Sequence, residues 1–257
     1  MPATVLRVTA GHARPTVPTE PVARGSKENT NNFLGSPPAT AVAEKVERMV
    51  RLRVRIRFSK LGDLRLIGHR DLMRCFERLF RRAGLALGFS QGFHPKPRMT
   101  FPLALAVGIE GLDEVMEVEL AEPADADDLS RRLTLQAPPG LVFRSVAALP
   151  EGGSKARVQG ASYDVPIPAC RQVGLGERID RLLAAASWPI ERAHGRASID
   201  VRPLIRELTF AEDVLTMRLR VDQGGSAGPR EVLAALGLAD IERHGVHPRR
   251  TAIEVVA

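Results

Sequence analysis

The sequence predicts an α+β fold of two tandem ferredoxin-like units that follow a disordered N-terminal tail. Between about residues 51 and 150, segments with strand and helix periods follow the order strand, helix, strand, strand, helix, strand. After a glycine-rich break at 151–160, the same order returns more weakly over 161–257. With 257 residues, 44% of them apolar, the chain is long enough to bury a sizeable core.

Residues 1–48 are rich in Pro, Thr, Ala and Asn and show no sustained period, which predicts a disordered tail. The ordered pattern starts just after Met49. A mis-assigned translation start, with Met49 as the true one, is therefore a hypothesis that N-terminal sequencing of the native protein tests.

In the first unit, the segment RLRVRIRF alternates between arginine and apolar residues, which predicts a half-buried strand. The following run HRDLMRCFERLFRRAG has apolar residues at helical spacing, and Gly84 is placed to end that helix. The remaining patterns predict strands at 85–89, 100–106, 115–120 and 141–149 and a helix at 125–135.

The second unit is predicted from weaker patterns of the same kind. They indicate strands at 161–168, 198–205, 214–221 and 251–256 and helices at 177–186 and 229–236.

Positive charge is concentrated near the start of the ordered region. Residues 51–100 hold thirteen Lys or Arg and three acids, a larger excess than the net charge of +7 for the whole chain. A local field of this size favours encounter with polyanions such as RNA. The candidate anion-binding residues are Arg51, Arg53, Arg55, Arg57, Arg70, Arg74, Arg78, Lys96 and Arg98. The alternative is that the arginine strand is simply a solvated sheet face, although four like charges on one strand repel one another.

The loop SQGFHPKPR at 90–98 combines a flexible glycine, two rigid prolines and three cationic or titratable side chains. It suits oxyanion recognition, or else it only shapes a strand connection. His69, at the start of the first helix, and His94 are weak candidates for an acid–base pair, because imidazole titrates near neutral pH. Asp71 is placed to cap the same helix.

Membrane and metal sites are not indicated. Apolar runs are interrupted well before the roughly 20 residues of a membrane span, and the N-terminal residues lack a secretory signal, so a cytoplasmic location is expected. Cys75 and Cys170 are too few and too far apart to hold an iron–sulfur cluster or zinc, so we expect no metal site and no bound cofactor.

The runs KLGDLRLIGHRDLMRCFERLFRRAGL, FSQGFHPKPRMTFPLALAVGIEG, SIDVRPLI and GPREVL resemble the radical-SAM-linked domain family of unknown function, over about residues 51–256. The family's motifs fall on His69, Asp71, Ser90, Gly92, Phe93, Pro95, Asp200 and Arg202. Gly68 and Gly228 depart from the family's usual serine and arginine. The resemblance implies a B12-binding-type radical SAM partner that carries the iron–sulfur cluster and S-adenosylmethionine, in an RNA setting.

Three functions follow as expectations. The first is a non-catalytic module that binds RNA, such as tRNA or rRNA, and presents it to the radical SAM partner. The second is an endoribonuclease or RNA-modifying enzyme that uses His69 and His94, by analogy of fold alone. The third is a docking module for an acidic protein partner.

Overall fold

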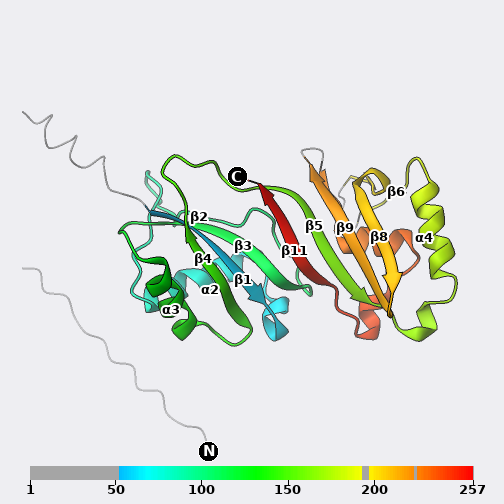
Figure 1. Ribbon diagram of the computed structural model, residues 1–257, viewed down its shortest axis with the longest axis horizontal. Coiled ribbons are helices and arrows are strands. Elements are labelled where there is room, and N and C mark those ends of the chain that lie inside the picture. The colour runs from blue at the N-terminus through cyan, green and yellow to red at the C-terminus, as the bar shows by residue number, and fades with distance from the viewer. Residues whose placement is uncertain (1–51, 193–196, 223–224, 257) are drawn as a thin grey trace, which may run out of the picture. The chain divides into compact units, whose positions relative to one another are not determined.

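The computed structural model describes residues 52–192, 197–222 and 225–256 (Figure 1). The predicted tail at 1–48, the start at Met49 and the candidate Arg51 lie outside these residues. The described part confirms an α+β fold with one mixed nine-stranded sheet and four α-helices. No described helix has the length and apolar character needed to cross a membrane.

The strands and helices have the following bounds. The strands are β1 (Leu52–Lys60), β2 (Met99–Thr100), β3 (Glu110–Leu120), β4 (Leu141–Ala148), β5 (Arg157–Pro166), β6 (Pro189–Ile190), β7 (Ile199–Asp200), β8 (Ile205–Ala211), β9 (Val214–Asp222), β10 (Gly225–Ser226) and β11 (Arg249–Val256). The helices are α2 (His69–Arg82), α3 (Ala126–Gln136), α4 (Leu175–Ala184) and α5 (Pro229–Ala235). Short 3-10 helices are η1 (Gly62–Leu66), η2 (Ala169–Arg171), η3 (Arg202–Leu204) and η4 (Ile241–His244).

One sheet runs through both halves of the described chain. The strands of the first half lie in the order β2-β3-β1-β4 and those of the second half in the order β8-β9-β5-β11, with antiparallel neighbours in each half. The halves meet where β11 pairs in parallel with the first residues of β3. β2 pairs with the same edge of β3, near the other end of that strand. β6 and β7 form a separate two-stranded sheet.

The alternation of β1 produces the first core. Val54, Ile56 and Phe58 are at most 1% exposed, because their face of the sheet is covered by α2 and α3. The ring of Phe58 meets that of Phe76 on α2 edge-on at 5.0 Å, a favourable aromatic arrangement. α4 and α5 cover a second core, built on β5, β8 and β9.

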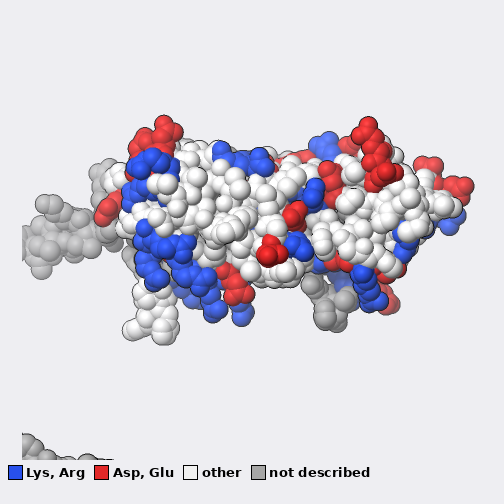
Figure 2. Space-filling view, turned by 90° about the horizontal axis from the view of Figure 1, so that it is seen from below, with Lys and Arg blue, Asp and Glu red and all other residues white. Residues whose placement is uncertain are grey.

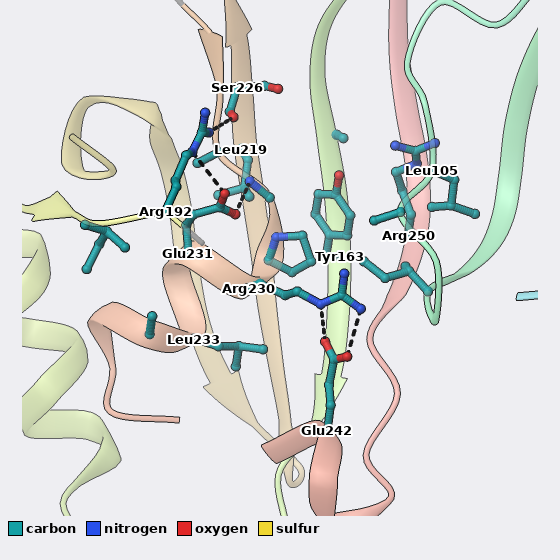
Figure 3. Close-up of a pocket in the computed structure, with 18 of the residues that line it drawn as sticks. Leu105, Tyr163, Arg192, Leu219, Ser226, Arg230, Glu231, Leu233, Glu242 and Arg250 are labelled. Atoms are coloured by element: carbon teal, nitrogen blue, oxygen red, sulfur yellow. Dashed lines mark hydrogen bonds and ion pairs between the residues drawn. The ribbon is translucent and has the colours of Figure 1, made fainter. Parts of the chain in front are cut away.

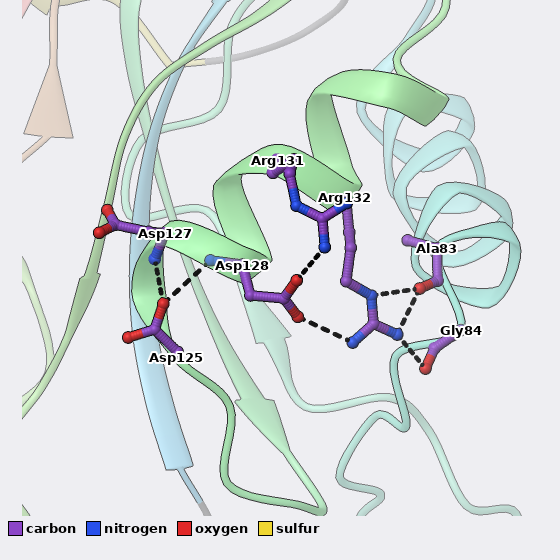
Figure 4. Close-up of polar contacts among 7 residues, drawn as sticks. All are labelled: Ala83, Gly84, Asp125, Asp127, Asp128, Arg131 and Arg132. Atoms are coloured by element: carbon purple, nitrogen blue, oxygen red, sulfur yellow. Dashed lines mark hydrogen bonds and ion pairs between the residues drawn. The ribbon is translucent and has the colours of Figure 1, made fainter.

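An arginine of α3 holds the C-terminal end of α2 by hydrogen bonds (Figure 4). Gly84 follows the helix with φ +64°, a conformation that favours glycine, as the sequence predicts. The guanidinium group of Arg132 donates to the carbonyls of Ala83, at 2.9 and 2.6 Å, and Gly84, at 2.7 Å. α3 itself begins at the cap residue Asp125, whose carboxylate accepts two backbone N–H bonds of the first turn.

Three predicted strands are wrong. Residues 85–89 make only isolated bridges at Leu87 and Phe89. Of the predicted strand at 100–106 only Thr100 pairs, and residues 101–109, here called the strap, cross toward the second half. The strap carbonyls of Leu103 and Ala104 accept from Arg250 instead of from a strand.

Of the predicted strand at 198–205 only Ile199 and Asp200 pair, as β7 with β6. The Asp200 carboxylate accepts the backbone N–H groups of Trp188 and Arg202, at 2.7 and 3.1 Å. This local bonding favours a turn, and the 3-10 helix η3 then begins at Arg202, with Pro203 in its first turn. The pairing strand is β8, at Ile205–Ala211.

Charged side chains are buried where the two halves meet. Arg250 is 1% exposed, and its guanidinium group makes two bonds to the carboxylate of Glu114, which is 4% exposed. Lys60, also 1% exposed, donates to the carbonyl of Ile67 at 2.9 Å. Burial lowers the pKa of the Lys60 amine, partly against the attraction of Glu114.

Candidate anion-binding surface and an arginine-lined cavity

The arginines of β1 are already paired. Arg53 and Arg55 both contact the carboxylate of Glu117 on β3, at 2.9 and 2.8 Å, and Arg57 pairs with Asp113. Burial alone would raise the pKa of Glu117, but its bonds to the two arginines outweigh this effect and lower the pKa. The expectation of an exposed, mutually repelling guanidinium face on this strand is therefore wrong for these three residues.

The arginines of α2 are arranged differently. Arg70, Arg74, Arg78 and Arg81, here called the α2 stripe, are exposed and recur every three or four residues, so they share one side of the helix. Arg74 has one distant partner, Asp71 at 3.6 Å, and the other three have none among the described residues. In Figure 2, which views the molecule from below, Lys and Arg gather most densely over the half that contains α2.

Residues 88–98 form a closed hairpin. Ser90 accepts the backbone N–H of Lys96 on its hydroxyl and donates its own N–H to the Lys96 carbonyl, at 3.0 and 2.9 Å. Arg98 is held by the Phe89 carbonyl at 3.2 Å and by Glu119 at 3.3 Å, so of the hairpin's two cations only Lys96 lacks a described side-chain partner.

The tip of the hairpin is open to solvent. The Phe93 side chain is fully exposed, and His94 and Pro95 beside it are exposed as well. Gly92 has φ +123°, a conformation that other residues rarely adopt. An apolar ring is thus presented beside cationic or titratable groups.

The two candidate catalytic histidines lie in different elements. His69 opens α2 and contacts the ring of Phe101 edge-on at 5.4 Å, whereas His94 is at the hairpin tip. No hydrogen bond or ring contact joins them in the part of the chain that the structure describes. Asp71, in the first turn of α2, makes its contact with Arg74, and no side chain caps the helix at Gly68.

Asp200 and Arg202 form local structure. Both the hydroxyl of Ser187 and the backbone N–H of Trp188 lower the pKa of the Asp200 carboxyl. Arg202 donates from Nε to the carbonyl of Leu183, near the end of α4, at 2.9 Å. These two motif residues therefore connect α4, β6 and β7, mainly through backbone groups.

A cavity with a volume of about 750 Å³ could not be predicted from the sequence. The strap, β5, β9 and α5 line it (Figure 3). Its apolar surface includes Leu105, Ile109, Leu219 and Leu233. Its charged lining consists of four arginines and three glutamates: Arg192, Arg230, Arg243, Arg250, Glu191, Glu231 and Glu242. These elements are too far apart in sequence for any spacing rule to bring them together.

Ion pairs hold the cavity walls in place. Arg230, on α5, donates to both carboxylate oxygens of Glu242, at 2.7 and 2.8 Å, and to the strap carbonyl of Val107 at 2.8 Å. Arg192 donates to the carbonyl of Ser226 at 2.5 Å, and its Nε lies 3.1 Å from Glu231. That Nε is buried and makes no hydrogen bond among the described residues.

A buried phenol also lines the cavity. Tyr163 is 6% exposed, and burial raises the pKa of its hydroxyl, so the group stays protonated at neutral pH. No group of three or more metal-ligating side chains occurs among the described residues. Both cysteines are free thiols; Cys75 is half-buried on α2 and Cys170 is exposed.

Comparison with known proteins gives a family and little else. A family model described as "Uncharacterized protein conserved in bacteria (DUF2344)" matches residues 53–229. No curated protein matches the chain. Among solved structures, the chain is similar to one described as an unknown protein from Galdieria sulphuraria, with 15% identity over 80% of this chain and 99% of that one. The TM-score of that match is 0.24, so the likeness carries no argument.

Proposed function

The chain belongs to the DUF2344 family of uncharacterised bacterial proteins, and we propose that it is an accessory module that binds RNA, such as tRNA or rRNA, and presents it to a radical SAM enzyme. The observation that carries the RNA part is the α2 stripe, where three of four exposed arginines have no partner among the described residues. The radical SAM part rests on the sequence resemblance alone.

The α2 stripe is a better anion site than the arginines of β1. A phosphate that approached Arg53 or Arg55 would compete with the carboxylate of Glu117, which both already contact. On α2 there is little such competition. Arg81 follows Arg70 by eleven positions, or about 16 Å along the helix, so several phosphates of one strand can be contacted together. Released counterions then drive binding.

The hairpin at 88–98 adds a second kind of contact to the proposal. A solvent-exposed ring such as Phe93 is a surface on which an unpaired base stacks, and stacking is typical of single-stranded RNA recognition. The nearby Lys96 supplies a cation for the backbone. The hairpin thus favours single-stranded RNA over a duplex.

We further infer that the architecture is two ferredoxin-like units. In each half the elements run β-α-β-β-α-β when the four main strands are counted, and the sheet order is 4-1-3-2 in that count, which is the ferredoxin-like arrangement. On this view the boundary lies near residues 150–160, and the shared edge of β3 joins two units into one sheet.

A binding role is favoured over catalysis by this chain. His69 and His94 have no contact with each other among the described residues, and general acid–base chemistry needs both groups within reach of one substrate. Any iron–sulfur cluster or S-adenosylmethionine would belong to the partner enzyme.

The test is RNA binding by a variant in which Arg70, Arg74 and Arg78 are replaced by Gln. A matched control replaces Arg157, Arg181 and Arg220, which are exposed in the second half, by Gln as well. Both variants lose three positive charges, and glutamine keeps the helix propensity high.

We expect the α2 variant to bind single-stranded RNA at least tenfold more weakly, with a slope of log affinity against log salt smaller by about 2, at roughly 0.7 per lost contact. The control variant should keep most of its affinity. Equal losses in both variants would mean that net charge alone attracts RNA. Binding of an acidic protein that survives nuclease treatment, with no RNA affinity, would favour the docking alternative.

A further inference from the structure

We propose that the cavity between the strap and α5 binds a small organic oxyanion, a carboxylate or phosphate monoester that carries an apolar body. None of the α2 stripe residues lines this cavity, so the proposal is independent of RNA binding.

The size and the apolar surface fit such a ligand. Small-molecule sites usually have volumes of roughly 300–1,000 Å³ and are mostly apolar, and this cavity has a volume of about 750 Å³. Leu105 and Ile109 face it from the strap end, and Leu219 and Leu233 from β9 and α5. An aliphatic or aromatic body gains free energy by leaving water for this surface.

The polar part of the lining is rich in hydrogen-bond donors. A guanidinium group has five N–H donors. The side chain of Arg243 makes no bond to another described residue, and Arg192 bonds the Ser226 carbonyl and forms an ion pair with Glu231 at 3.1 Å. Both oxygens of Glu242 are taken by Arg230, and Glu231 accepts the backbone N–H of Gly228 at 3.0 Å. The arginines of the lining therefore have more N–H donors than the carboxylates around them accept.

An oxyanion is the ligand head that satisfies this excess. Carboxylates and phosphates accept several charge-assisted bonds from arginine. The buried Nε of Arg192 lies 3.1 Å from Glu231 but makes no hydrogen bond among the described residues. Glu191 also lines the cavity; it and Arg243 are both exposed, so water screens both charges. The protonated hydroxyl of Tyr163 adds a donor within the lining.

The walls are preorganised, which reduces the entropy lost on binding. Arg230 ties α5 to the strap and to Glu242, as Figure 3 shows for the carboxylate. Arg250 ties the other part of the strap to β11 through the carbonyls of Leu103 and Ala104. The cavity therefore exists before any ligand arrives.

The experiment is isothermal titration calorimetry of the full chain with three straight-chain ligands of eight carbons each. Octanoate and octyl phosphate carry the two oxyanion heads, and octylammonium carries a cation. We expect saturable binding of both anions at one site, with octylammonium at least tenfold weaker. Whichever anion binds more tightly identifies the head that the site prefers.

Two substitutions test separately how the charged head and the apolar body of the ligand contribute to affinity. Arg243→Gln should weaken both anions at least fivefold without weakening octylammonium, because a repelling charge is removed. The control Arg181→Gln, on exposed α4 surface away from the lining, should change nothing. Ala234→Leu, which fills the cavity from α5, should weaken all three ligands. Urea midpoints equal to that of the parent show that the variants are folded.

Three results would overturn the proposal. The first is the absence of saturable anion binding to the parent chain. The second is octylammonium binding as tight as that of octanoate. The third is Arg243→Gln and Ala234→Leu variants, both folded, that bind the anions as the parent does.

Discussion

Replacing Arg250 by Met tests whether the buried ion pair at the junction of the halves holds the fold together. The substitution keeps an aliphatic stem of similar length but removes the guanidinium group. Glu114, 4% exposed, then keeps a buried charge without its partner, and the strap carbonyls of Leu103 and Ala104 lose their donor.

Breaking a buried pair in this way costs about 3–5 kcal/mol of unfolding free energy. For a chain of this size, that corresponds to a fall in the melting temperature of roughly 6–20 °C. Urea denaturation, followed by circular dichroism and fitted to two states, measures the loss directly.

The neighbouring residue supplies a matched control. Arg249 also pairs with a β3 carboxylate, that of Glu110 at 3.1 Å, but its side chain is 58% exposed. Arg249→Met should therefore cost no more than about 1 kcal/mol. The double variant Glu114→Met/Arg250→Met removes both charges and should recover part of the loss, since no carboxylate stays buried without its partner. The reasoning fails if Arg250→Met costs as little as Arg249→Met, or if the double variant is no more stable than the single.

Three further predictions concern the first half. Arg132→Met should lower stability by about 1–3 kcal/mol, because it leaves the last carbonyls of α2 without their donor, whereas Arg131→Met, on an exposed pair, should change the urea midpoint little. Asp125→Ala removes the α3 cap and should lower the unfolding free energy by about 1 kcal/mol. The side chain of Asp127 does not cap the helix, so Asp127→Ala should change the unfolding free energy little; equal losses in the two variants would argue against the cap. The pKa of Glu117 is lower in the folded state than the unfolded value of 4.5, so its stabilisation is complete above that pH and is lost as the pH falls through the folded value. Glu117→Gln should flatten this acid limb of the stability curve, and an unchanged limb would count against the assigned pairs.

Sequence periodicity predicted the elements whose faces it defines. The alternation of β1 identified Val54, Ile56 and Phe58 as the buried face, and the spacing in α2 identified its core side and the role of Gly84. It failed where a side chain captures backbone groups. The carboxylate of Asp200 bonds two N–H groups that a strand would need, and the guanidinium group of Arg250 bonds strap carbonyls 146 residues earlier.

The same limit explains why charge counted along the sequence did not show that the arginines of β1 are paired. A cluster of arginines attracts an anion only to the extent that the fold leaves it unpaired, and pairing on β1 is decided by Glu117, more than sixty residues downstream. On α2 the exposed side faces solvent, so the α2 stripe keeps its charge. Long-range pairing also formed the cavity, since the arginines that line it belong to segments whose sequences show no shared motif. The proposed anion sites of this chain therefore depend on which arginines the fold leaves without a carboxylate partner, and the number of arginines in a segment does not decide this.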